Sequence, residues 1–230
     1  VLALRLAGES WFSAVCHSFT TMATGGFSIY DTSLAGASKA VMWIITVFSF
    51  LAGVNFSLMF LAVRGKLKEV LRSEELRIYV GIVAAATLLL CINLRVQAGV
   101  PFGDSITDAA FQTVTIITTT GFSSCDFDLW PTLSKEVLVV LMFIGACAGS
   151  TGGGIKVSRI LILGKTLGKE LKTALHPQVV APARMDGKLL NHETIRTTNV
   201  FMAAYSFIFV GSFLLISLDG FDMVTNFTAV

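Results

Sequence analysis

Two short uncharged segments bring threonine and glycine together inside otherwise apolar sequence. They are Thr24-Gly25-Gly26 and Thr119-Thr120-Gly121, and Phe-Ser follows each of them. Threonine adds a hydroxyl oxygen without charge, and glycine adopts φ values that let successive carbonyl groups point the same way. Backbone carbonyls arranged in this way replace the hydration shell of a cation in ion filters. The residue types therefore predict a cation filter lined by uncharged oxygen atoms.

Both segments lie in a longer internal repeat. An offset of 95 residues places residues 14–28 (AVCHSFTTMATGGFS) over residues 109–123 (AAFQTVTIITTTGFS). A polar loop and a second apolar segment follow each copy, so we predict a repeated unit of helix, half-helix, threonine–glycine turn and helix. A further copy begins with residues 197–218. One threonine-rich helix end capped by glycine would be a common structural feature, but two copies in register favour a shared site.

The composition indicates a membrane protein. Of the 230 residues, 54% are hydrophobic and only 14% are charged, and the mean hydropathy is +0.76, whereas a soluble domain carries about 25% charged residues. A bilayer crossing needs about 20 apolar residues, and the uncharged runs that qualify are 40–63, 78–94 and 197–218. The shorter runs 11–23 and 105–117 predict re-entrant half-helices or buried core segments.

A fourth apolar run, 136–163, is interrupted by the sequence GSTGGGIKVSR. Each glycine costs a helix about 1 kcal/mol relative to alanine, so a broken helix is predicted. Irregular backbone at membrane depth is tolerated where it lines a cavity, and we interpret the break as a gate formed by Gly149, Ser150, Thr151, Gly152, Gly153, Gly154 and Lys156. A hinge for close helix packing is the alternative. A phosphate-binding loop is excluded because Ile155 separates the last glycine from the lysine.

Basic residues predict the orientation. Segments 64–77 and 164–196 hold most of the lysines and arginines, and the positive-inside rule places both segments in the cytoplasm. The net charge of +2 gives no indication of a nucleic acid partner. The four cysteines lack the spacing of a metal or redox site, so we interpret them as free thiols. Both ends lie inside apolar patterns, and we expect a piece of a longer chain.

These residues resemble a known family. TMATGGFS, TIITTTGFSS, the intervening LAGVNFSLMF and the glycine-rich break follow the order found in the Trk/Ktr/HKT superfamily of potassium transporters, most closely its bacterial TrkH-type membrane subunits. The resemblance implies an all-α membrane protein with repeated helix–re-entrant pore loop–helix units around a central pore. It implies potassium as the transported ion and no organic cofactor, with potassium bound by the backbone carbonyls of Thr24, Gly25, Thr119 and Thr120. A filter glycine goes with potassium in this family and a serine with sodium, so a sodium-permeable member stays open.

The resemblance also divides the chain. Residues 1–63 would form the second pore-loop unit, 64–77 a basic cytoplasmic linker, 78–175 the third unit with a broken exit helix, 176–196 a cytoplasmic linker, and 197–230 the start of a fourth unit. We expect a homodimer in the bacterial inner membrane, surrounded by lipid. The basic segment fits a cytoplasmic ring of nucleotide-binding regulatory subunits or a lipid-facing linker. A secondary transporter with a midplane site is the alternative function. No catalytic grouping of side chains stands out, so we do not expect an enzyme.

Overall fold

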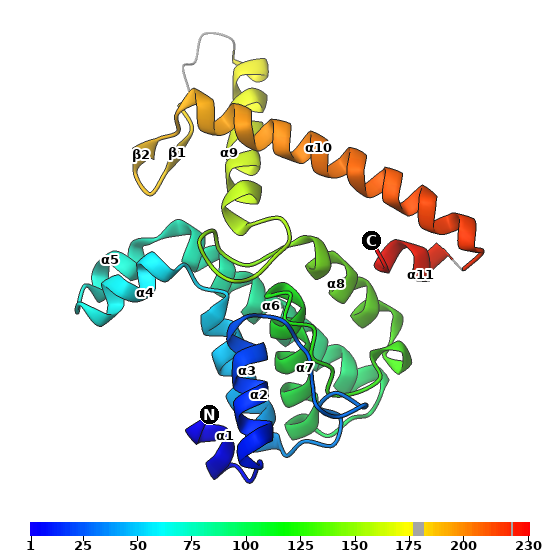
Figure 1. Cartoon of the computed structure of the whole chain (residues 1–230). Helices are drawn as coiled ribbons and strands as arrows, with labels where there is room; N and C mark the ends of the chain where they lie inside the picture. Colours follow the sequence, from blue (N-terminus) through cyan, green and yellow to red (C-terminus); the bar gives the residue numbers. More distant parts are fainter. Residues whose placement is uncertain (177–181, 222) are drawn as a thin grey trace. The chain divides into compact units, whose positions relative to one another are not determined.

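A computed structural model describes residues 1–176, 182–221 and 223–230. It consists of two compact units, Val1–Ser158 and Arg159–Val230. Its regular structure is almost entirely helical (Figure 1), which confirms the predicted all-α class. Residues 177–181, inside the predicted linker 176–196, and Asp222 in the predicted fourth unit lie outside the described residues.

The first copy of the repeat has a short helix before the filter turn and a longer apolar helix after it. After α1 (Leu2–Leu6), α2 (Trp11–Met22) covers only 12 residues, too few to cross a bilayer, as predicted for a half-helix. The side chains of Ser10 and Ser38 each accept a hydrogen bond from the backbone N–H three residues later, at the starts of α2 and α3 (Lys39–Ala52). These caps satisfy donors that a first helical turn leaves unpaired, so two serines fix where the apolar helices begin.

The uncharged run 40–63 is not one continuous span, and that prediction was wrong in its geometry. α3 ends at Ala52, α4 (Phe56–Val63) begins after Asn55, and the two helices are bent by 102° at the break. Asn55 caps α4 by accepting a hydrogen bond from the Ser57 N–H at 2.8 Å. Gly53 leaves no room for a side chain, because a Cβ there would lie 2.4 Å from the Tyr79 hydroxyl. The sequence LAGVNF therefore contains the break.

The second copy has the same order of elements, but the helix before its half-helix is much longer than α1. It comprises α6 (Glu74–Gln97), α7 (Phe102–Ile117), the 3₁₀ turn η1 (Phe127–Leu129) and α8 (Thr132–Phe143), preceded by the short α5 (Leu67–Arg72). α6 is long and apolar enough to cross a membrane, which confirms the predicted span at 78–94, and it packs along α7 (Figure 1). A non-helical segment separates α8 from α9 (Val157–Leu175), which confirms the predicted broken helix.

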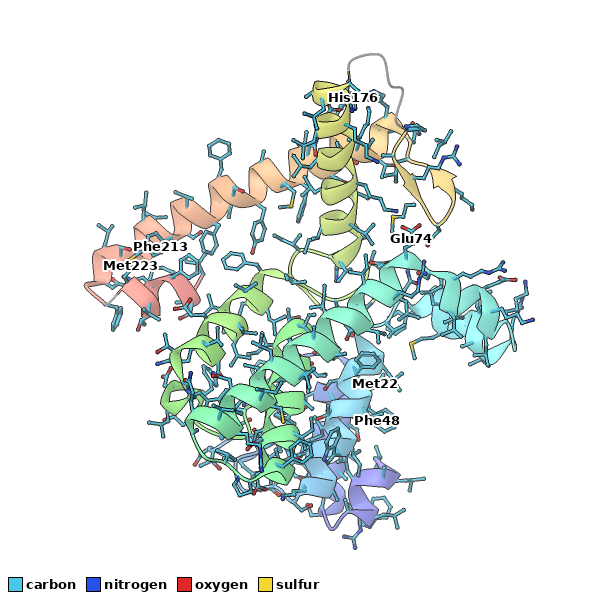
Figure 2. The ribbon with its side chains drawn as sticks, turned by 180° about the vertical axis from the view of Figure 1, so that it is seen from behind. Met22, Phe48, Glu74, His176, Phe213 and Met223 are labelled. Carbon is cyan, nitrogen blue, oxygen red and sulfur yellow. The ribbon has the colours of Figure 1, made fainter. Side chains whose placement is uncertain are left out.

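An apolar core joins the two copies within the first unit. Phe111 and Phe122 of the second copy are each 1% exposed and belong to the same buried cluster as Leu4, Ala14 and Ile45 of the first copy. Beside this cluster, Figure 2 shows Met22 at the end of α2 close to Phe48 of α3, and both line a small apolar pocket. This shared core holds the two half-helices, and hence the turns that follow them, in a fixed arrangement.

The second unit contains another helix long enough to cross a membrane. α10 (His192–Ile216) and the turn η2 (Ser217–Asp219) form 28 helical residues, which confirms the predicted span at 197–218. α11 (Met223–Thr228) follows, and its Phe227 packs edge-on against Phe209 and Phe213. The sequence did not predict the antiparallel hairpin of β1 (Arg184–Met185) and β2 (Lys188–Leu189). Asp186 and Gly187, both with positive φ, connect its strands, as a type I′ turn requires.

Gly53→Ala should destabilise the first unit, because the added methyl group would collide with the Tyr79 hydroxyl and with Thr118 Cγ2. Overpacking of this kind costs about 1–3 kcal/mol. Gly81→Ala is the control, since nothing lies within 4 Å of a Cβ at that position of α6. Thermal unfolding of the purified protein in detergent should show a lower midpoint for Gly53→Ala only. Equal midpoints for the two variants would contradict close packing at the break.

Candidate functional site

Both predicted filter turns end their half-helix with the same hydrogen bonds. Thr24 and Gly25 donate their backbone N–H groups, at 3.2 and 2.8 Å, to carbonyls three and five residues earlier. Thr119 and Thr120 do the same at 2.9 and 2.8 Å. This pair of bonds is the Schellman motif, in which the residue after the helix adopts a left-handed conformation. The repeat seen in the sequence therefore extends to the backbone geometry.

The sign of φ alternates along each turn. Thr24 and Gly26 have φ values of 49° and 66°, and Thr119 and Gly121 have 57° and 83°, whereas the residue between each pair is not left-handed. The two turns therefore share one backbone pattern, in which left-handed residues flank a residue with negative φ.

The carbonyl oxygens of the predicted cation ligands are available. Within the part of the chain that the structure describes, the backbone oxygens of Thr24, Gly25, Thr119 and Thr120 accept no hydrogen bond. In the same part of the chain, no group of three or more His, Cys, Asp or Glu side chains is placed to hold a metal ion. The candidate ligands for a cation in the first unit are therefore neutral backbone oxygens.

The two turns lie directly against each other. A Cβ on Gly26 would lie 1.8 Å from the Thr120 carbonyl oxygen and 3.0 Å from the carbonyl carbon of Gly121. Only glycine therefore permits this approach, and the structure brings all the predicted filter residues into one cluster. A Cβ on Gly121, in contrast, would meet nothing within 4 Å.

Polar side chains on both half-helices hold the segments that leave the turns. His17 on α2 and Gln112 on α7 occupy equivalent positions of the repeat and are at most 1% exposed. The His17 ring nitrogens lie 3.1 Å from Ser13 Oγ and 3.0 Å from Ser28 Oγ, and Gln112 Nε2 lies 3.5 Å from Ser124 Oγ. Each half-helix is thus bonded to the chain just beyond its own turn, which limits how far the turn can relax.

The predicted gate residues form a closed loop between α8 and α9. Its two limbs pair at a parallel bridge between Ile144 and Ile155, where the Gly145 N–H donates to the Ile155 carbonyl at 2.7 Å. A Cβ on Gly145 would lie 2.2 Å from the Gly153 carbonyl oxygen, so glycine is required where the limbs cross. The Lys156 ammonium donates to the Gly152 carbonyl and so bonds the loop to itself. We call residues 144–156 the glycine-rich loop.

The glycine-rich loop contacts both filter turns through threonine hydroxyls. Thr24 Oγ1 donates to the Thr151 carbonyl at 3.1 Å, and Thr119 Oγ1 accepts from the Gly153 N–H at 2.7 Å. These are the two left-handed threonines, at positions where a non-glycine residue costs roughly 1–2 kcal/mol and where helix ends usually place glycine. Strain of this kind is concentrated at functional sites, and here the strained residues connect the two turns to the glycine-rich loop.

The same loop completes the open end of α3. The Cys147 N–H donates to the Gly53 carbonyl at 3.0 Å, and the Thr151 hydroxyl donates to the Ala52 carbonyl at 3.2 Å. The last carbonyls of a helix have no partner within the helix, so the loop supplies the donors that the bend leaves missing. The glycine-rich loop at the α8–α9 break therefore donates hydrogen bonds to carbonyls that the α3–α4 break leaves without a helical partner.

One buried acid at this site was not predicted. Glu75, in the first turn of α6, is 6% exposed and accepts hydrogen bonds from the Ala148 N–H at 2.6 Å and the Ser158 N–H at 3.2 Å. In the sequence SEELRIYV it resembles any acid in a first helical turn. Only its position at the edge of a long uncharged run could have drawn attention to it.

Comparisons with known proteins agree with this geometry. The family model described as "TrkH: Cation transport protein" matches residues 7–230. The chain is 36% identical over its whole length to the Trk system potassium uptake protein TrkH of Escherichia coli K12 and 28% identical to TrkG of the same organism, covering 48% of each. It superposes on the crystal structure of the potassium transporter TrkH from Vibrio parahaemolyticus with a TM-score of 0.93 at 36% identity, covering 99% of this chain and 50% of that one. The chain thus spans about half the length of these relatives.

Thr119→Val should loosen the glycine-rich loop, because it keeps the branched shape but removes the acceptor of the Gly153 N–H. The loss of one such bond, about 1 kcal/mol, should lower the thermal midpoint of the purified protein by about 2–4 °C. Thr119→Ser retains the hydroxyl and is the control. If the valine and serine variants unfold at the same temperature, the hydroxyl does not hold the loop.

Proposed function

This chain belongs to the TrkH family of cation transport proteins, and from that premise we propose that it forms part of a pore for potassium ions in the bacterial inner membrane. The proposal rests on one observation above the others: two matched turns meet with four unpaired carbonyl oxygens. Potassium fits such a site because backbone carbonyls replace its hydration shell.

The different surroundings of the two copies support further units around the same pore. Gly26 of the first turn packs against the second turn, whereas the equivalent Gly121 faces open space. Phe122 is 1% exposed in the shared core, whereas the equivalent Phe27 is 78% exposed. If further copies followed the second and preceded the first with the same spatial relation that joins these two, another turn would pack against Gly121 and another half-helix against Phe27. We therefore keep the division of the chain into a second unit (1–63), a third unit (78–175) and the start of a fourth (197–230).

We propose that the glycine-rich loop is the gate. It is bonded to both filter turns, and it consists of non-helical backbone between α8 and α9, which a membrane tolerates where the backbone lines a cavity. In this position the loop would block the path of an ion that leaves the filter. A change in loop position would then control flux without altering the ligands that select the ion.

We also propose that a cytoplasmic regulatory partner binds a basic surface of the second unit. In the second unit, Lys165, Lys169 and Lys172 of α9 surround a hollow together with Arg184 of the hairpin. Such a basic surface would attract an acidic partner. We propose in addition that the full-length protein forms a homodimer, as its resemblance to the family implies.

Gly121→Ser should lower the selectivity for potassium over sodium. The φ of 83° at Gly121 strains any residue other than glycine, so the carbonyl positions should shift. A loss of discrimination of about 1.4 kcal/mol changes a permeability ratio tenfold, and that is the scale expected in flux assays with the full-length protein in liposomes. Gly26→Ser should instead prevent folding, because of the collision with the Thr120 carbonyl. An unchanged ratio for Gly121→Ser would remove this turn from the filter.

Gly152→Ala should raise potassium flux and leave the selectivity unchanged. An added methyl group would lie 2.7 Å from Ala146 Cβ and 2.9 Å from the Thr118 carbonyl oxygen, so the loop must leave its position. Overpacking by about 1 kcal/mol shifts a two-position equilibrium roughly fivefold. Gly164→Ala, with open space around it on α9, is the control. A changed selectivity with unchanged flux would contradict the gate assignment.

A further inference from the structure

A buried carboxylate closes the base of the glycine-rich loop. Glu75 Oε1 accepts from the Ala148 N–H, on the limb that enters the loop, and from the Ser158 N–H, just beyond the limb that leaves it. Both bonds converge on one oxygen atom, at 2.6 and 3.2 Å. Glu75 comes from α6, 73 and 83 residues before these two partners, and Figure 2 labels its neighbour Glu74 at the end of α6 that lies beside the loop.

The helix α6 itself does not require Glu75 in this position. The side chain of Ser73 already caps α6 by accepting a hydrogen bond from the Leu76 N–H. A glutamate in a first helical turn is ordinarily exposed, and a buried one is rare unless it is paired. Glu75 is 6% exposed, and its partners are two N–H groups of the broken helix, so its burial is explained by the loop.

The partners of Glu75 favour a negative charge. Ser158 lies in the first turn of α9, where backbone N–H groups lack helical partners and the helix dipole is positive. Hydrogen bonds from such donors to a carboxylate are roughly twice as strong as neutral ones. The Ala148 bond attaches the loop to the same charge, beside Cys147, which is fully buried.

We propose that Glu75 is a positioning residue for the gate: its carboxylate holds the glycine-rich loop in the position that blocks the pore, and the loop moves when the Ala148 bond breaks. This inference rests on the proposed function. Because the hydrogen bonds of Glu75 go to Ala148 and Ser158 and not to the filter turns, its loss should change how often the loop moves and leave ion selection intact.

The thiol of Cys147 reports on the loop without any ion flux. In the full-length protein, with every other cysteine replaced by alanine, a membrane-permeant maleimide should label Cys147 slowly, because its side chain is buried. Glu75→Gln keeps the size and one acceptor oxygen but removes the charge, and it should raise the labelling rate on the order of tenfold. The control is Glu69→Gln, which removes an exposed acid paired with Lys66 and should label at the parent rate. Equal rates for Glu75→Gln and the parent would overturn the proposal.

Potassium flux in liposomes separates this proposal from the proposed function. We expect Glu75→Gln to increase flux with an unchanged potassium-to-sodium ratio, and faster labelling without increased flux would overturn the gating role. If the parent protein carries no potassium while labelling still depends on Glu75, the proposed function fails and the loop contact stands. Loss of the Glu75 charge by itself makes the neighbouring Cys147 thiol more reactive, and Glu75→Gln need not yield a monodisperse protein, so the second variant is Glu75→Asp. It keeps the charge but withdraws it by one methylene group, so it should also label faster.

Discussion

Backbone polar groups at membrane depth must find partners inside the protein, because hydrocarbon offers none, and the first unit is organised around this constraint. At the ends of its half-helices and bent helices, backbone N–H and carbonyl groups have no partner within the helix. The carbonyls at the end of α3 are satisfied by Cys147 and Thr151 of the glycine-rich loop, and the loop limbs pair with each other through Ile144 and Ile155. With these groups paired, the carbonyls of Thr24, Gly25, Thr119 and Thr120 at the two turns differ in accepting no hydrogen bond among the described residues.

The same constraint explains why filter and loop form one assembly. A left-handed residue is needed to end each half-helix, and glycine would provide it at the lowest cost. Thr24 and Thr119 take these positions instead, and their hydroxyls bond to the loop. The backbone conformation of both turns is thereby held by the same side chains that bind the glycine-rich loop. A displacement of the loop would act on threonines whose conformation is already strained.

The sequence predicted the features that follow from composition and repetition. Long apolar runs without charged residues identified α6 and α10. The threonine–glycine turns and the glycine-rich break were predicted at the positions where they occur. The bend at Gly53 was missed because a single glycine within an apolar run does not reveal the Tyr79 hydroxyl packed against it. Glu75 was missed because its donors, Ala148 and Ser158, are far away in the chain. Both depend on contacts between segments that are far apart in the chain, which local patterns do not encode.

Equivalent glycines in the two turns are required for different physical reasons. Gly26 is required by space, since the Thr120 carbonyl occupies the position of its Cβ, whereas Gly121 has open space and is required by its φ of 83° alone. A motif match would treat the two residues as the same. Their difference arises because each turn uses one side to contact the next turn around the axis, and the first unit shows only one such contact. If further turns close the ring, Gly121 acquires the second requirement as well, and the tolerance of that position to a side chain becomes a measure of whether the ring is complete.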